Sequence, residues 1–331
     1  MSTRRRPRVL TVVAALGGVI LFAYAVHRVG AGSILSSIRN VGWGFSVILA
    51  LAGLRFLART QAWQQCWPSG SGLPFSQALT AFIAGDAIGN MTPLGLAASE
   101  PAKVFLTRHH VATAKAVSSL ALDNLVYSGS AIAMIALGIV VMLDTVRLPR
   151  VWQEGALLAL AALGLAAALG WRWMRRSSAV DAGAGRWRLR VQRLHESIVQ
   201  FTRGNARGLW RAFVFDFVFH ALAVVEGYLT LRWLLGDHSP TLSQAIVFEA
   251  LNRVVTVAFK FVPFRVGVDE AVSGAFAPLV AVNPITGVSL AVVRKVRNLF
   301  WAGVGVAIIA VHPVPGVRAT DRPGTASVHR T

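Results

Sequence analysis

Two stretches of the chain decide its fold: PLGLAASE at residues 93–100 and PFRVGVDE at residues 263–270. In each, a Pro stands seven positions before a Glu, and a Gly lies between them. Each also belongs to a longer shared pattern, in which Ser-Gln-Ala comes before the stretch and Asn-Leu follows it, five positions before a Gly. Duplicated hydrophobic segments that Pro and Gly interrupt point to the binding site of a membrane transporter.

We therefore expect two related membrane hairpins, at 75–143 and 241–311. Their breaks would act as hinges because a helix cannot continue through Pro and Gly at these positions. The predicted hinge residues are Pro93, Gly95, Pro263 and Gly267.

The composition is that of an integral membrane protein. Hydrophobic residues make up 55% of the chain, charged residues make up 14%, and the mean hydropathy is +0.58. Soluble domains carry about 25% charged residues. The formal charge is 33 − 14 = +19. The arginines cluster beside apolar segments, which is typical of loops that face anionic lipid headgroups and argues against a nucleic-acid partner. Cys66 is the single cysteine, which excludes an internal disulfide and a Cys-based metal cage. We predict no metal and no cofactor.

Six stretches are apolar and long enough to cross a hydrocarbon core of about 30 Å. They are residues 9–28, 43–63, 112–143, 151–174, 209–235 and 284–311. Residues 75–107 and 241–283 are also apolar, but Pro and Gly break them. Such backbone survives at membrane depth only inside protein or beside a water-filled cavity. We therefore predict an all-α polytopic membrane protein with about six full spans, two re-entrant hairpins and an inverted repeat. A single transmembrane domain would cover 1–312, and a disordered tail would cover 313–331.

Positive charge predicts the orientation in a bacterial inner membrane. The arginines of residues 4–8 place the N-terminus in the cytoplasm, and the Arg-rich loop at 175–208 lies there too. Four crossings and one re-entrant hairpin connect these points, so the two hairpins enter from opposite faces and the C-terminus is cytoplasmic. Two full crossings in place of each hairpin would leave the ends on the same sides, and this alternative stays open.

Charged residues inside the predicted membrane regions are the candidate site. Each costs about 2.5–3.5 kcal/mol on insertion scales, so it must face an opposite charge, a wet cavity or a ligand. We interpret Asp216, Glu226 and Lys260 as structural ion pairs or as side chains that snorkel to the interface. The predicted substrate-binding residues are Asn90, Glu100, Lys103, Asp123, Glu249, Arg253, Arg265, Asp269, Glu270, Arg294 and Arg297.

Arg294 and Arg297 are three positions apart and share one face of a helix. Two guanidinium groups placed in this way suit a phosphate or a carboxylate. In the alignment of the two repeats Arg297 takes the place of Asp123, which predicts an ion pair between these two residues.

Glu100 and Glu270 each follow a break, where a restarting helix offers free backbone N–H groups to an anion. A Glu in the first helical turn can also be a plain capping residue. Asn90 and Asn252 could line the transport path or hydrogen-bond a neighbouring helix.

At these residues the chain resembles the membrane domain of the lysylphosphatidylglycerol synthase/flippase family, over about residues 9–311. The resemblance rests on Leu54-Arg55 to Trp63, on Pro93 through Glu100 to Lys103, on Asp123, and on Pro263 through Glu270 to Ala271. The chain departs from the family's pattern at Lys103, Asn124, Phe264, Arg265 and Asp269, which changes the charge of the presumed cavity. Synthases of the family carry a soluble aminoacyltransferase domain after the membrane part. The resemblance therefore implies a stand-alone flippase-like protein without that domain.

We expect a protein that is not an enzyme and that moves an anionic phospholipid or a lipid-linked headgroup between leaflets. Two alternatives stay open. One is a secondary transporter of a small charged solute, and the other is a non-transporting partner that docks a lipid-modifying enzyme through the 175–208 loop. An intramembrane enzyme is the least favoured, because carboxylates without a nucleophile pattern supply only acid and base groups.

Overall fold

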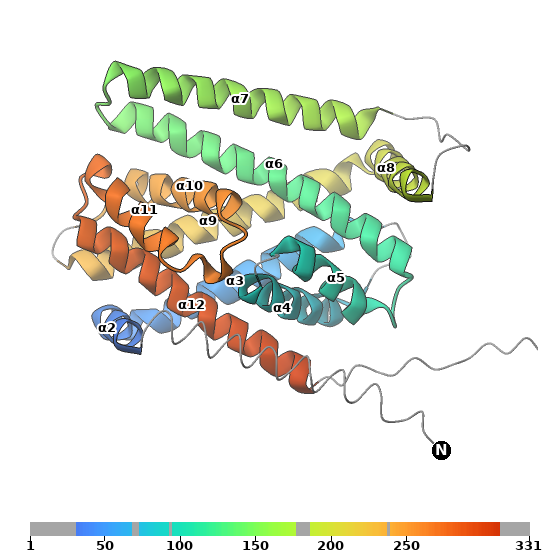
Figure 1. Cartoon of the computed structure of the whole chain (residues 1–331), viewed down its shortest axis with the longest axis horizontal. Coiled ribbons are helices and arrows are strands. Elements are labelled where there is room, and N and C mark those ends of the chain that lie inside the picture. Colours follow the sequence, from blue (N-terminus) through green and yellow to red (C-terminus); the bar gives the residue numbers. More distant parts are fainter. Residues whose placement is uncertain (1–30, 68–72, 93–94, 177–185, 237–238, 312–331) are drawn as a thin grey trace, which may run out of the picture.

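The computed structural model describes residues 31–67, 73–92, 95–176, 186–236 and 239–311. Over these residues the chain forms helices, with no strand (Figure 1). In chain order they are α2 (Ala31–Val41), α3 (Gly44–Gln64), α4 (Phe75–Met91), α5 (Leu96–Thr107), α6 (Thr113–Thr145), α7 (Arg150–Arg175), α8 (Arg186–Gly204), α9 (Ala206–Leu235), α10 (Leu242–Ala258), η1 (Pro263–Arg265), α11 (Val268–Phe276), η2 (Ala277–Val280) and α12 (Pro284–Val311).

Four of these helices are long and apolar enough to cross a membrane: α3, α6, α7 and α9. Helix α12 has 28 residues, but Arg294, Lys295 and Arg297 make its middle less apolar. The predicted all-α polytopic membrane fold is confirmed. Five predicted spans coincide with α3, α6, α7, α9 and α12, whereas the predicted span 9–28 and the predicted tail 313–331 lie outside the described residues.

The two predicted hairpins are pairs of shorter helices, α4 with α5 and α10 with α11. Helices α5 and α11 have 12 and 9 residues. They extend about 18 Å and about 14 Å, so neither can cross a hydrocarbon core of about 30 Å by itself. The first break passes through Gly95 at φ +48°, and the second passes through Phe264, Arg265 and Gly267, all at positive φ. Predicted hinge residue Pro93 lies outside the described residues.

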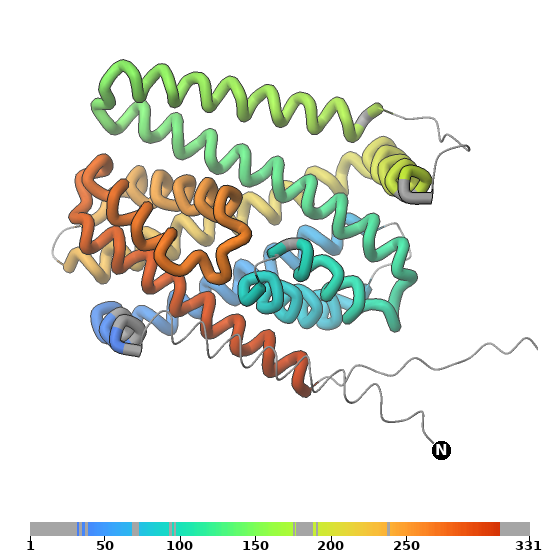
Figure 2. The backbone as a smooth tube through the Cα atoms, in the orientation of Figure 1, coloured from blue at the N-terminus to red at the C-terminus, as the bar shows by residue number. Residues whose placement is uncertain are grey.

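Each half of the chain packs against the other half. Helix α4 of the first hairpin lies on α12, and α10 of the second hairpin lies on α6 (Figure 2). Glycine makes both approaches possible. A Cβ at Gly305 would lie 2.5 Å from the Cβ of Ala87, and one at Gly138 would lie 2.1 Å from the Cβ of Ala250. Small residues at crossings allow membrane helices to pack closely, and this packing brings the two breaks into one bundle.

The segment predicted as an Arg-rich loop at 175–208 contains a helix, α8. It lies across the ends of the long helices and packs on α6, α7 and α9 (Figure 1). His195 holds it in place, because the imidazole stacks on Trp173 with ring centroids 4.3 Å apart. Spacing explains the difference from the prediction: Leu194, Ile198 and Phe201 recur at helical intervals and pack on the core, while Arg193 and Arg203 on the other side are exposed.

Candidate functional site

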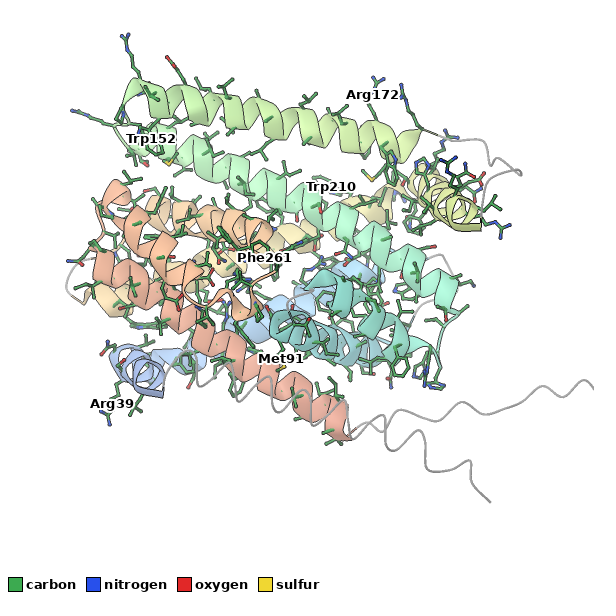
Figure 3. The ribbon with its side chains drawn as sticks, viewed as in Figure 1. Arg39, Met91, Trp152, Arg172, Trp210 and Phe261 are labelled. Atoms are coloured by element: carbon green, nitrogen blue, oxygen red, sulfur yellow. The ribbon has the colours of Figure 1, made fainter. Side chains whose placement is uncertain are left out.

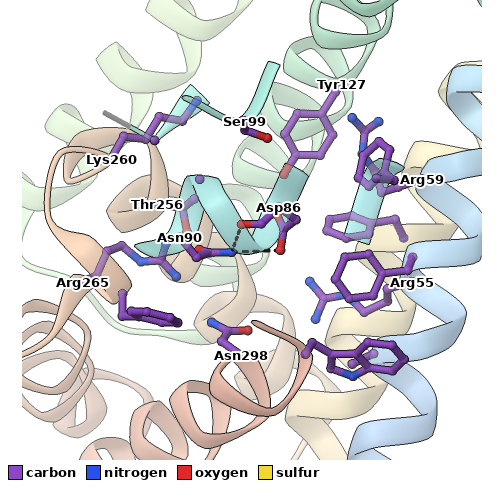
Figure 4. A pocket seen from close by; sticks show the side chains of 18 of the residues that line it. Arg55, Arg59, Asp86, Asn90, Ser99, Tyr127, Thr256, Lys260, Arg265 and Asn298 are labelled. Atoms are coloured by element: carbon purple, nitrogen blue, oxygen red, sulfur yellow. Dashed lines mark hydrogen bonds between the residues drawn. The ribbon is translucent and has the colours of Figure 1, made fainter. Parts of the chain in front are cut away.

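A cavity of about 240 Å³ lies between the two hairpins and the central helices α3 and α9. Its wall combines α3, α4, α5 and α6 from the first half with α9, α10, η1 and α12 from the second. Figure 4 shows Arg55 and Arg59 on one side of this cavity, with Lys260 and Arg265 on the opposite side. The cavity is therefore a property of both halves together.

The wall of the cavity is strongly basic. Two acidic residues, Asp86 and Glu100, line it. The lining side chains thus carry a formal charge of 7 − 2 = +5. The seven basic residues are Arg55, Arg59, Lys103, Arg253, Lys260, Arg265 and Arg297.

The carboxylates that hold the central arginines lie behind this wall, not on it. Arg59 binds both Asp123, with Nη2 2.8 Å from Oδ2, and Asp216. Glu226 binds Arg55 at 2.8 Å and also binds Arg297. Helices α3 and α9 therefore join their opposite charges in the middle of the bundle.

A similar arrangement supports the second hairpin. Glu249 lies 2.7 Å from Nε of Arg253 and 3.4 Å from Nη2 of Arg294. Glu249, like Asp123, Asp216 and Glu226, is exposed by 1% or less, and none of the four is among the described lining residues. Removing one partner of a buried ion pair costs about 3–5 kcal/mol. The four buried carboxylates thus hold the guanidinium groups in place, and the charged side chains that line the cavity are mostly basic.

Aromatic rings support the same cations. The guanidinium carbon of Arg59 lies 4.3 Å from the centre of the Tyr127 ring, and that of Arg55 lies 4.4 Å from the Phe219 ring. Tyr127 also accepts a hydrogen bond of 2.9 Å from Nη1 of Arg253. Rings stabilise desolvated cations through their negative faces, so Tyr127 and Phe219 stabilise the arginines that line the cavity.

Asp86 differs from the buried acids. Its Oδ2 accepts a 2.9 Å hydrogen bond from Asn90 (Figure 4), and among the described residues it forms no ion pair. Glu100, the other acid of the wall, lies 2.9 Å from Nζ of Lys103. These two carboxylates are the groups that a positively charged part of a ligand would meet.

The two helix breaks meet beside the cavity. A Cβ at Gly95 would lie 3.1 Å from the backbone oxygen of Lys260, so the first break touches the chain just before the second. Gly95 has φ +48°, a conformation that glycine adopts at little cost. A larger residue would strain this turn and separate the two breaks.

The structure brings seven of the predicted site residues into the lining of one cavity. They are Asn90, Gly95, Glu100, Lys103, Arg253, Arg265 and Arg297. Asp123, Glu249 and Arg294 lie behind the wall in ion pairs, and Asp269 binds Arg265 at 3.0 Å. Pro263 and Gly267 flank the turn that carries Arg265. Glu270 lies apart from the cavity lining and binds Lys295.

The predicted ion pair between Asp123 and Arg297 is wrong. Asp123 binds Arg59, and Arg297 binds Glu226. Helices α3 and α9 pack along each other and supply the partner for each charge, which an alignment of the two hairpins does not include. Asp216 and Glu226 do form ion pairs, the first with Arg59 and the second with Arg55 and Arg297.

Four charged residues of the lining were not among the predicted site residues: Arg55, Arg59, Asp86 and Lys260. A signal for the first two was present, because they lie four positions apart within an apolar span and so share one helix face. Asp86 and Asn90 have the same spacing on α4. Lys260, interpreted as structural, also lines the cavity.

These features define a multi-pass α-helical membrane protein with a basic cavity enclosed by two broken hairpins. The family model described as "Lysylphosphatidylglycerol synthase TM region" matches residues 9–306. The chain belongs to this family, and the resemblance found in its motifs is confirmed. Comparison with curated proteins and with solved structures gives no match. Family membership supports a role connected with membrane lipids.

Proposed function

We propose that this protein receives the phosphate-bearing headgroup of an anionic lipid, or of a lipid-linked molecule, in the basic cavity and moves it between leaflets. One observation carries the proposal: a wall of formal charge +5 in the middle of a membrane bundle. Such charges are costly in lipid and typically mark a substrate path. The proposed activity is transport without catalysis.

Arginine suits this task because its planar guanidinium binds phosphate oxygens in pairs. Arg55 and Arg297 converge on Glu226, which leaves two guanidinium groups sharing one carboxylate. A phosphate in the cavity would complete their hydrogen bonds. Charge-assisted bonds of this kind contribute about 1.5–3 kcal/mol each.

Transport also requires that the cavity open to each side in turn. The contact between Gly95 and the backbone of Lys260 lies where the two hairpins meet, so separation at this point would change access to the cavity. Alternating access by two related halves is the usual mechanism of transporters built from repeats. We propose the same mechanism, with an inverted repeat, for this chain.

The distribution of surface charge supports the orientation that we propose in a bacterial inner membrane. Exposed basic residues gather at the end of the bundle that carries α8, where Arg172 is labelled in Figure 3. They include Lys115, Arg172, Arg176, Arg188, Arg193, Arg203, Arg207 and Arg211. Basic residues next to spans favour the cytoplasmic side. In this orientation α8 faces the cytoplasm.

Lipid movement in proteoliposomes tests the proposal. The wild-type protein should scramble anionic lipids faster than neutral ones, and R297A should lower the rate at least about tenfold, since it removes a charge-assisted contact. R232A is the matched control, because Arg232 is exposed on α9 and is not among the lining residues. No headgroup preference together with full activity of R297A would disprove the proposal. Uptake of a soluble phosphorylated solute without scrambling would indicate a secondary transporter.

A further inference from the structure

Lys260 has an unusual environment for a charged residue. It lines the cavity and is exposed, and its ammonium group has no hydrogen-bond or ion-pair partner among the described residues. Its neighbour Phe261, which is 62% exposed, lies near the middle of the bundle's length (Figure 3). An unpaired charge near the middle of a membrane bundle is costly, so a ligand or water must reach it.

The backbone around Lys260 is held in position. Its carbonyl oxygen lies against Gly95, so Lys260 stands where the two hairpins touch. Figure 4 shows Lys260 at the edge of the cavity, across from Arg55 and Arg59. Since Lys260 both lines the cavity and is exposed, the cavity reaches the protein surface at this edge.

An apolar stripe leads up to this opening. Val254, Val257 and Phe261 are exposed by 44%, 58% and 62%. Val254 and Val257 are three residues apart on one face of α10. Phe261 lies in the turn that follows this helix, next to Lys260. A phosphate-binding cation at the end of an exposed apolar track matches the two parts of a phospholipid.

We infer that the cavity opens sideways into the bilayer at Lys260. The phosphate of an entering lipid contacts the Lys260 ammonium, while the acyl chains lie on the stripe formed by Val254, Val257 and Phe261. The inference rests on the proposed function and adds the route by which the lipid enters the cavity. It also separates a lipid cargo from a soluble one, since a soluble phosphate has no use for the stripe.

The first test concerns the charge. Binding of short-chain phosphatidylglycerol and of glycerol phosphate is measured with the purified full chain in detergent. K260Q should weaken binding of short-chain phosphatidylglycerol about tenfold, as expected for loss of a charge-assisted contact, and K260R should restore it. K115Q is the matched control, because Lys115 is exposed on α6 and does not line this cavity.

The second test concerns the stripe. The double variant V257S with F261S should weaken binding of short-chain phosphatidylglycerol about tenfold, because apolar contact with the acyl chains is lost. Binding of glycerol phosphate should stay at the wild-type level. Both side chains are exposed, so the fold does not depend on them.

The results separate the two proposals. Wild-type phosphatidylglycerol binding by K260Q or by the stripe variant overturns the sideways opening, and so does an equal loss of both ligands in the stripe variant. If R297A still abolishes lipid movement in that case, the proposed function stands without this route. If none of these variants affects lipid binding or movement, the proposed function falls as well.

Discussion

The two hairpins share a sequence pattern, yet their glutamates have different partners. Glu100 lines the cavity and binds Lys103 of its own helix at 2.9 Å. Glu270 accepts a 2.9 Å hydrogen bond from the backbone N–H of Gly267 and also binds Lys295 of α12. The first glutamate therefore faces the space that a ligand would fill, and the second closes the start of its own helix.

This difference shows how a repeated pattern can serve two purposes. The capping interpretation holds for Glu270, whose contacts with Gly267 and Lys295 tie the second hairpin to α12. The two helix breaks also differ in how firmly they are packed. Phe264 is 3% exposed and packs on Met91 and Leu299, which anchors the second break, whereas Gly95 has no side chain. The first hairpin is thus the more open to ligands and the second is the more firmly built.

Replacement of Glu270 should give the largest effect on stability. The Lys295 side chain is 0% exposed and would lose its carboxylate partner in E270A. Loss of one member of such a pair should lower the free energy of unfolding by about 3 kcal/mol. Denaturant unfolding in detergent measures this, with E100A as the comparison. Equal stability of the two variants would remove the distinction between the hairpins.

Alanine at the two break glycines should give the next effect. Both glycines have positive φ, which costs a residue with a side chain about 1–2 kcal/mol. In G95A the new Cβ would also lie 3.1 Å from the backbone oxygen of Lys260, whereas at Gly267 it meets nothing within 4 Å. We expect G95A to destabilise the protein more than G267A and to slow lipid movement as well. A larger loss in G267A would contradict this account of the two breaks.

The smallest effect on stability is expected for E100Q, because glutamine has nearly the same size and its side-chain oxygen can still accept the hydrogen bond from Nζ of Lys103. Removing its charge makes the wall more positive, so an anionic headgroup should bind a few times more tightly. Binding of short-chain phosphatidylglycerol measures the change, and thermal unfolding should match that of the wild type. Weaker binding by a stable E100Q would mean that Glu100 contacts a positive part of the ligand.

The helices were largely predictable from local sequence. Apolar runs of about 20 residues require helices in a membrane, and the predicted boundaries of α3 and α12 differ from the structure by at most a residue. The breaks were predictable because Pro and Gly interrupt a helix within one turn of the position that they occupy. Helix α8 was not predicted because its many arginines indicated a polar loop, although its apolar residues recur at helical spacing.

The site was predictable only in part. Charges close to a break, such as Lys103 and Arg265, line the cavity as their position indicated. Arg55 and Arg59 lie in a helix without a break, so no local pattern connected them with the hairpins.

The sequence by itself determined that this chain is an α-helical membrane protein, where its helices break, and that charges gather near those breaks. These properties follow from hydrophobicity and backbone geometry within a few residues. Only the tertiary structure decided which charges pair. The partners of Arg55 and Arg59 lie up to 171 residues away, and the packing of α3 against α9 and α6 selects them. Burial of the carboxylates behind the arginines also depends on that packing, so the positive sign of the cavity is a property of the assembled bundle.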